Sequence, residues 1–268
     1  MLSVIVLTNG NERGVVPTPF ADTLVSPVAS ALAILRSTVQ RQTFEPVVEA
    51  RTFRVAMSDI GERLFLPRLM SHLADVAPHV VVEAVSPSLG ELHDGLGSGQ
   101  IDLAVGYLSD LGKQMHQRRL FHERFVYVAR KDHPSIKGPL RREQLRELRH
   151  VIAGPEGMQH AASVEKVLSG PRVKARVALR VHSFLCVGPI VASTDLIGPV
   201  PSNLGAMVAT HMDLQLIEPP VQFPGFDVTM TWHQRFHRDP GSEWLRGVLI
   251  ALFDSQTIVA EAKARTRA

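Results

Sequence analysis

Two successive series of alternating strand and helix patterns constrain the fold of this chain more than any other feature. In the first series, apolar residues alternate as in strands and then recur at helical spacing; the segments are residues 53–57, 65–76, 80–82, 89–96 and 101–105. Strand alternating with helix predicts βαβ units around a mainly parallel sheet.

A second series follows the polar stretch 130–134, which ends in proline and predicts a crossover. Its strand patterns cover residues 151–152, 176–181, 196–200 and 214–216, and its helical patterns cover 161–168 and 184–192. A strand at 228–232 and a helix from Glu243 to about Val259 are left over, and we expect them to complete the first series. Two lobes joined by two crossings predict a clamshell with a ligand cleft between the lobes.

An amphipathic helix precedes both series. Thr18 and Pro19 predict its start, since a hydroxyl cap followed by proline at the first helical position favours a helix. One apolar stripe follows, formed by Phe20, Leu24, Val28, Leu32, Leu35 and Val39. Pro27 should bend or split this helix. The stripe packs against its own domain or against another subunit, and we favour the subunit.

The composition is that of an ordinary globular protein, with 45% hydrophobic and 21% charged residues. A net charge of +3 is too small for a nucleic-acid footprint. Cys186 is the only cysteine, and its apolar neighbours predict a buried, inert thiol. Residues 1–7 lack the pattern of a secretory signal, and no apolar run approaches the roughly 20 residues that span a membrane. We therefore expect a cytoplasmic protein without membrane contact.

Neither a catalytic motif nor a metal motif is present. The chain contains no G-x-S-x-G, Walker loop or H-E-x-x-H. His233 and His237 have the spacing of a helical metal pair but follow a strand, so hydrogen-bonded structural histidines are the better interpretation. The glycines at 95, 97 and 99 precede a strand, which favours turn and helix-stop roles over a dinucleotide fingerprint. We expect no enzyme activity, no cofactor and no metal.

Five sequence blocks, in their order and spacing, resemble the sensor domain of LysR-type transcription regulators. They are residues 56–62 (AMSDIGE), 99–106 (GQIDLAVG), 130–134 (RKDHP), 194–197 (TDLI) and 232–239 (WHQRFHRD). The branch that answers aromatic compounds and plant flavonoids is the most similar. Residues 14–21 resemble the end of the family's wing and the start of its linker helix, so the resemblance extends over nearly the whole chain from Arg13.

The resemblance implies an α/β, two-lobed effector-binding domain of the type 2 periplasmic-binding-protein-like fold, preceded by a linker helix. The implied segments are a residual wing or altered amino terminus (1–18), the linker helix and connection (19–48), lobe I (51–130 plus 226–268) and lobe II (131–225). The implied ligand is a small aromatic or carboxylated inducer in the interlobe cleft. The family also implies a homo-oligomer, a dimer or a tetramer assembled partly through linker helices.

Members of the family carry a winged helix-turn-helix before this point, and residues 1–12 do not supply a recognition helix. We therefore expect DNA contact only if a full-length form provides that DNA-binding head.

The ends of the predicted strands supply the candidate ligand contacts in lobe I. Ser58, followed by Asp59 and Ile60, ends the first strand and precedes a helix, so its hydroxyl and the nearby amides could hold a carboxylate or a phenol. Alternatively, Ser58 or Asp59 only caps the helix. Gly106 and Tyr107 end the third strand on the same rim, where the tyrosine ring could stack on an aromatic ligand.

Lobe II contributes further candidates through the resemblance. His160 precedes a helix at a position where similar regulators have a cleft-facing histidine; an exposed helix cap is the alternative. Ser183 and Phe184 stand in His182-Ser183-Phe184, where those relatives often have Pro-His-Phe, so the phenylalanine matches and the histidine does not. Pro201 is expected to shape the cleft wall.

Other classes of function remain open at this point. The same clamshell would serve a solute-binding protein that delivers a ligand to a transporter, or an enzyme. A subunit without a DNA-binding head could also join intact regulators and disable them.

Overall fold

The computed structural model describes residues 8–11, 14–39, 43–108, 111–154 and 159–254. The side chains of residues 8–17, 33, 34, 36–39 and 159–162 lie outside that description. The chain divides into two compact units, residues 1–43 and residues 44–268.

The first unit is a hairpin followed by a helix. Strands β1 (Thr8–Asn11) and β2 (Gly14–Pro17) pair antiparallel, within the segment that the resemblance assigned to a residual wing or altered amino terminus. Helix α1 (Pro19–Val39) begins as predicted, with the Thr18 hydroxyl accepting a hydrogen bond from the Ala21 amide at 3.2 Å. The helix continues through Pro27, so the predicted split does not occur.

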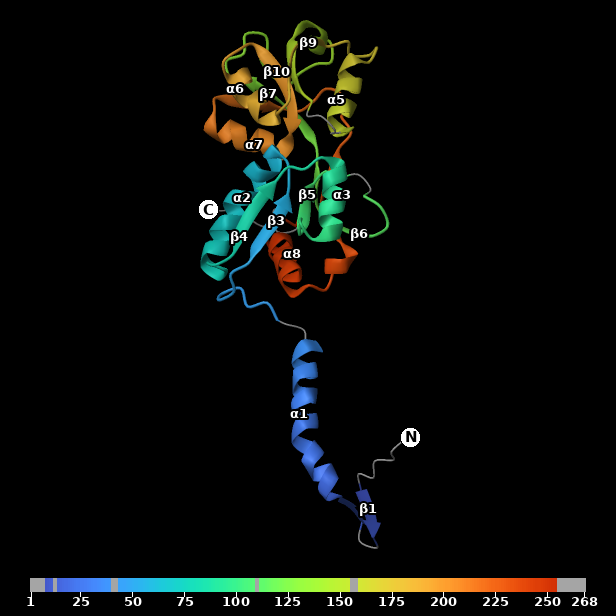
Figure 1. Ribbon diagram of the computed structural model, residues 1–268. Helices are drawn as coiled ribbons and strands as arrows, with labels where there is room; N and C mark the ends of the chain where they lie inside the picture. Colours follow the sequence, from blue (N-terminus) through green and yellow to red (C-terminus); the bar gives the residue numbers. More distant parts are fainter. Residues whose placement is uncertain (1–7, 12–13, 40–42, 109–110, 155–158, 255–268) are drawn as a thin grey trace. The chain divides into compact units, whose positions relative to one another are not determined.

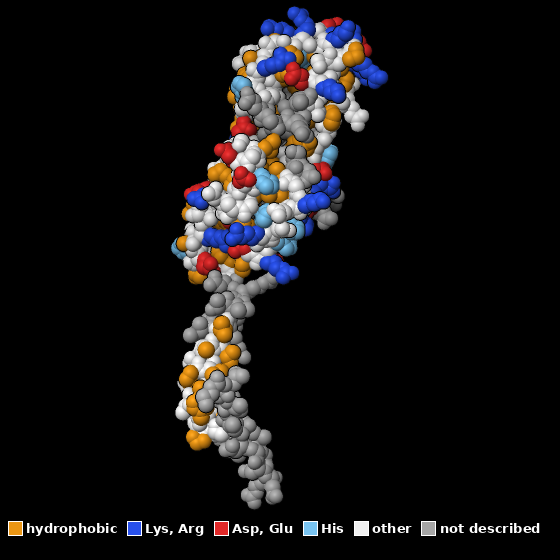
Figure 2. All heavy atoms as spheres, turned by 45° about the vertical axis from the view of Figure 1, so that its right-hand side comes forward, with side chains coloured by type: hydrophobic (Ala, Val, Ile, Leu, Met, Phe, Trp, Pro, Cys, Tyr) orange, Lys and Arg blue, Asp and Glu red, His pale blue; other side chains and the backbone are white. Residues whose placement is uncertain are grey.

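The apolar stripe of α1 is solvent-exposed within this unit. Phe20, Val28, Leu32 and Leu35 are exposed, whereas Leu24 is half-buried. The side chain of Val39 lies outside the described residues. Figure 2 shows hydrophobic side chains gathered along this helix. Such a continuous exposed stripe is typical of a helix that packs against a partner.

The second unit contains two five-stranded sheets, each with its own helices (Figure 1). The first sheet has the order β4-β3-β5-β12-β6 and forms lobe I with the surrounding helices. The elements of lobe I are β3 (Thr52–Ala56), α2 (Asp59–Val76), β4 (Val81–Val85), α3 (Leu89–Ser98), β5 (Leu103–Gly106), β6 (Met115–Glu123), β12 (Phe226–His233), η2 (Gln234–Phe236) and α8 (Pro240–Phe253).

The second sheet has the order β11-β7-β10-β8-β9 and forms lobe II. The elements of lobe II are β7 (Phe125–Arg130), α4 (Gln144–Glu147), β8 (Arg149–Ala153), α5 (Gln159–Ser169), β9 (Arg176–Val181), η1 (Phe184–Cys186), α6 (Val187–Ala192), β10 (Leu196–Pro201), α7 (Ser202–His211) and β11 (Leu214–Ile217). Together the lobes give the two-lobed α/β architecture that the sequence predicted.

Both sheets are mixed, which corrects the expectation of a mainly parallel sheet. In lobe I, β12 runs antiparallel to β5 and β6, and in lobe II, β7 runs antiparallel to β10 and β11. Strand β6 was not predicted, because its first five residues are mostly exposed and polar and show no apolar alternation. The return of the chain at β12 to complete lobe I occurs as predicted.

The first crossing between the lobes lies earlier than the sequence indicated. Residues 125–130 were assigned to lobe I, but β7 pairs with β10 and β11 of the second sheet. Strand β6 of lobe I ends at Glu123, so the chain passes between the sheets at Arg124. Only Arg124 separates β6 from β7. The apolar pattern of the sequence therefore could not show that these two strands belong to different sheets.

Gly99, His233 and His237 have structural roles in lobe I. Gly99 ends α3 in the left-handed region, with a φ of 83°, which is the predicted helix-stop role. His233 lies at the end of β12 and accepts from the Arg235 amide, whereas His237 accepts from the Trp232 indole at 3.2 Å. Among the described residues, no three His, Cys, Asp or Glu side chains lie close enough together to hold a metal ion.

One apolar core cluster extends through both lobes. It includes Phe184 and Val187 of the segment around Cys186, but Cys186 itself is exposed, so the prediction of a buried thiol was wrong. Residues 184 and 187 are one 3₁₀ turn apart and both are buried, which leaves Cys186, just before Val187, facing outward. None of the described helices is long and apolar enough to cross a membrane.

Two polar aromatic side chains are fully buried in lobe II. The rings of Tyr127 and His150 lie 5.8 Å apart in an edge-on arrangement. Burial raises the pKa of Tyr127 and lowers the pKa of His150, although a hydrogen bond from His150 Nε2 to the Leu145 carbonyl opposes the second shift. Burial of the imidazole therefore favours the neutral form of His150 in the folded state.

The lowered pKa of His150 predicts acid sensitivity. The pKa of His150 in the folded state lies below its unfolded value of about 6.5. Below that pH the unfolded chain binds the proton more readily than the folded chain does. The folded state therefore loses stability as the pH falls. In urea denaturation at pH 7 and pH 5.5, His150→Gln should show a smaller loss of stability on acidification than the unmodified chain. His79→Gln, at an exposed histidine, is the control and should retain the original loss. An unchanged acid response in His150→Gln would contradict the assignment.

Candidate functional site

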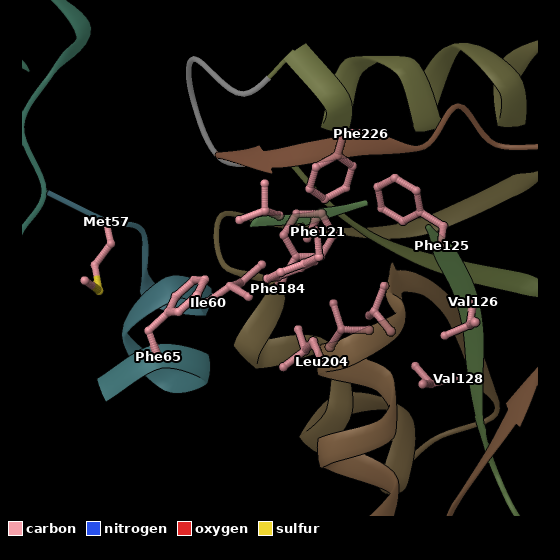
Figure 3. Close-up of a cluster of buried hydrophobic side chains, with 14 of the residues drawn as sticks. Met57, Ile60, Phe65, Phe121, Phe125, Val126, Val128, Phe184, Leu204 and Phe226 are labelled. Atoms are coloured by element: carbon pink, nitrogen blue, oxygen red, sulfur yellow. The ribbon is translucent and has the colours of Figure 1, made fainter. Parts of the chain in front are cut away.

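A small cavity of about 50 Å³ lies where helix α2 and the strand ends of lobe I meet lobe II. It is lined by Ser58, Ile60, Gly61, Leu64, Phe65, Gly106, Tyr107, Phe121, Glu123, Pro201, Phe226 and Val228. Lobe I supplies all of these except Pro201, which ends β10 of lobe II. Figure 3 shows Ile60 and Phe65 on α2, with Phe121 and Phe226 beside them and Leu204 on the helix of the other lobe.

The amino terminus of α2 forms the polar part of the wall. Ser58 has extended backbone angles, and its hydroxyl accepts a hydrogen bond from the Gly61 amide at 3.3 Å. The Asp59 carboxylate accepts from the Ile60 amide at 2.8 Å. Ser58 is therefore a helix cap that also lines the cavity, so the two roles considered from the sequence coexist at this residue.

A hydrogen bond joins the lobes beside the cavity. The Ser183 hydroxyl in lobe II donates to the Asp59 carboxylate in lobe I. The same hydroxyl oxygen accepts from the Leu185 amide at 3.1 Å, which caps the short helix η1. Asp59 thus connects the start of α2 to the start of η1, and it lies outside the cavity wall.

Glu123 forms the second polar connection between the lobes. It ends β6 of lobe I and is only 2% exposed. Its carboxylate accepts hydrogen bonds from the Ser202 amide and hydroxyl and from the Asn203 amide and side-chain amide, at 2.5–3.3 Å. Helix α7 has no cap from its own preceding residue, Pro201, so Glu123 satisfies its first amides.

Aromatic rings continue the wall toward lobe II. The Tyr107 and Phe226 rings are edge-on, with centroids 5.3 Å apart, and Phe226 lies 5.7 Å from Phe125. Phe125 in turn contacts Phe184 and Phe223, at centroid distances of 6.5 and 5.9 Å. These separations are typical of favourable aromatic pairs. Figure 3 shows Phe226, Phe125 and Phe184 of this series within the buried cluster.

The structure brings together most, but not all, of the residues that the sequence singled out. Ser58, Ile60, Gly106, Tyr107 and Pro201 line the same cavity. Ser183 and Asp59 bridge the lobes next to it, and Phe184 is buried behind it. The side chain of His160, near the start of α5, lies outside the described residues.

Sequence reasoning missed Glu123, Phe121, Phe226 and Val228. Phe121 and Glu123 belong to β6, which was not predicted, and Phe226 and Val228 belong to the returning strand β12. The sequence contained one indication of a buried carboxylate. Glu123 stands between the apolar pair Leu120-Phe121 and the apolar strand that begins at Phe125. Only the tertiary fold shows that the start of α7 lies against it.

The chemistry of the cavity is that of binding. Its lining is mostly apolar, with Ser58, Tyr107 and Glu123 as polar exceptions. A buried space of about 150 Å³ holds a benzene ring, so the present cavity must widen before an aromatic ligand can enter. An open groove of about 420 Å³ adjoins it, shares Ser58, Gly106 and Tyr107, and continues past the start of α3.

The family model for the LysR substrate binding domain matches residues 48–254 of the chain. This range begins just before β3 and ends just after α8, so it includes both lobes and the cavity.

Two regulators and one solved structure illustrate the similarity. The chain is 39% identical to the HTH-type transcriptional activator NagR of a Ralstonia species, over 90% of this chain and 80% of that protein. It is 37% identical to the HTH-type transcriptional activator NahR of Pseudomonas putida, over 90% and 81% of the two chains. A crystal structure described as a probable transcriptional regulator from Pseudomonas aeruginosa matches with a TM-score of 0.68 and 28% identity, over 91% of this chain and 80% of that one.

The role of Glu123 between the lobes predicts a large stability effect. Glu123→Ala should lower the free energy of unfolding by about 2–4 kcal/mol, because it leaves the first amides of α7 buried without their acceptor. Chemical denaturation followed by circular dichroism measures the change. Glu83→Ala, at an exposed ion pair with Arg54, should cost less than about 1 kcal/mol. Equal losses for the two variants would show that Glu123 does not hold the lobes together.

Proposed function

Because the chain belongs to the LysR family of transcription regulators and carries its substrate-binding domain, we propose that a small aromatic inducer binds in the cavity between the two lobes. The observation that carries this proposal is a mostly apolar cavity whose wall includes Ser58 and Tyr107 of lobe I and Pro201 of lobe II. A flat ring fits such a wall, and the polar group at the start of α2 orients it. The family consists of regulators and not of enzymes.

Ligand binding is coupled to lobe geometry in this proposal. The cavity of about 50 Å³ is smaller than a benzene ring requires, so an inducer must move α2 and Pro201 apart. The bonds from Ser183 to Asp59 and from Ser202 to Glu123 oppose that movement. An inducer therefore shifts the equilibrium between two lobe arrangements by its differential affinity for them.

We further propose that the stripe on α1 mediates self-association, giving a dimer or a tetramer. LysR regulators oligomerise and bind DNA. In this chain, Val25 and four residues of the stripe are exposed within their own unit. Burying such a stripe against a second copy removes apolar surface from water. Contact with DNA through a winged helix-turn-helix, and a cytoplasmic location, stay predictions of the sequence.

The assignment of the cavity predicts the effect of removing one hydroxyl. Calorimetric titration of phenol, benzyl alcohol, benzoate and salicylate identifies which of these aromatic probes binds. For a probe that binds, Ser58→Ala should weaken binding about threefold to tenfold, which corresponds to the loss of one hydrogen bond.

Ser88→Ala is the matched control for this experiment. Ser88 caps α3 as Ser58 caps α2, but it lines only the adjoining groove and not the cavity. Both variants lose a cap of comparable value, about 1 kcal/mol, so a difference in affinity reports contact with the ligand. Unchanged affinity in Ser58→Ala, or an equal loss in Ser88→Ala, would place the ligand elsewhere.

The proposed role of α1 predicts the oligomeric state of variants. Leu32→Glu introduces a charge into the centre of the stripe and should shift the chain toward smaller species in light scattering at matched concentration. Ser26→Glu, on the opposite side of the helix, is the control and should leave the mass unchanged. An unaltered mass for Leu32→Glu would rule out this stripe as the contact.

A further inference from the structure

We propose that the cavity selects an uncharged aromatic ligand with a neutral polar substituent, such as a hydroxyl, an aldehyde or a carboxamide, and disfavours aromatic carboxylates. This inference rests on the proposed function, since it names the ligand class of the same cavity. The sequence left open whether the inducer is aromatic or carboxylated, and this proposal favours an aromatic inducer without a carboxylate. Three features of the cavity wall support it.

The first feature is a negative charge in the wall. Glu123 lines the cavity and is 2% exposed, so water screens its charge poorly. The hydrogen bonds that hold its carboxylate come from neutral donors: the amides of Arg124, Ser202 and Asn203 and the side chains of the latter two. The guanidinium of Arg124 donates its hydrogen bond to Glu218 and interacts with Glu123 only through charge. A ligand carboxylate in this cavity would therefore meet a like charge in an apolar environment.

The second feature is the occupation of both helix starts at the cavity. The amides at the start of a helix are a common docking point for anionic ligands. At α2, the Gly61 amide bonds to the Ser58 hydroxyl and the Ile60 amide bonds to the Asp59 carboxylate. At α7, the first amides bond to Glu123. The protein's own oxygen atoms, two carboxylates among them, thus occupy the positions where an anionic substituent would bind.

The third feature is the lack of a basic side chain among the described residues of the cavity wall. Of the described residues that line the cavity, none is a lysine, an arginine or a histidine. The Ser58 hydroxyl accepts one hydrogen bond from Gly61, which leaves its own hydrogen for an acceptor on a ligand. A neutral oxygen on an aromatic ring meets that requirement without adding a charge.

Pairs of ligands with the same shape and different charge test the proposal. We would titrate the full chain calorimetrically with benzamide against benzoate and with salicylamide against salicylate. The neutral member of each pair should bind at least about tenfold more tightly, a difference of about 1.4 kcal/mol. Equal affinities, or tighter binding of the carboxylates, would overturn the proposal.

Glu123→Gln separates charge from shape. This variant keeps the size of the side chain and one carbonyl acceptor but removes the negative charge, so the preference for the neutral ligand should fall at least threefold. Glu83→Gln removes an exposed carboxylate outside the cavity and should retain the preference of the unmodified chain. A preference that is unchanged in Glu123→Gln overturns the role of this charge. If Glu123→Gln does not fold, the ligand pairs on the unmodified chain decide alone.

The outcomes distinguish this proposal from the proposed function. If the carboxylates bind the unmodified chain at least as tightly and lose affinity in Ser58→Ala, the cavity is the ligand site and only the charge preference is wrong. If no member of either pair binds at millimolar concentration, the charge preference fails together with aromatic binding in this cavity.

Discussion

The carboxylate of Glu123 at the start of α7 is the interaction on which the arrangement of the two lobes depends. Strand β6 of lobe I ends at this residue, the chain crosses at Arg124, and β7 of lobe II begins at Phe125. At the same point the carboxylate accepts from the first residues of α7. A buried charge is stable only with such partners, so the crossing and the helix must keep a fixed geometry. The cavity lies against this joint.

This geometry is consistent with the proposed binding of an inducer in the cavity. The lobes share one apolar core cluster, and few polar bonds bridge them near the cavity, notably Ser183 to Asp59 and Ser202 to Glu123. A continuous packed core resists gradual deformation, so an inserted ring is accommodated by a change in lobe arrangement. Membership of the LysR family and the proposed ligand binding are consistent with this arrangement.

Much of the fold could be predicted from local patterns. The alternation at residues 53–57 and 101–105 marked β3 and β5, and Thr18 with Pro19 marked the start of α1, because these patterns reflect steric and capping preferences of neighbouring residues. Strand β6 was missed because it is largely polar and exposed in its first half. Cys186 was placed in the core because its neighbours are apolar, and the phase of a 3₁₀ turn decided otherwise.

The sequence by itself determined the two α/β series, the helix caps at Thr18 and Ser58, and the candidate positions Gly106, Tyr107 and Pro201, since these strand ends and helix starts are encoded locally. Only the tertiary structure decided which strands share a sheet, that the chain crosses at Arg124, and that Glu123 lies against the start of α7. The residues of this last contact are about eighty positions apart in the sequence. A pairing over that distance has no local pattern, because it follows from the packing of the two lobes as a whole.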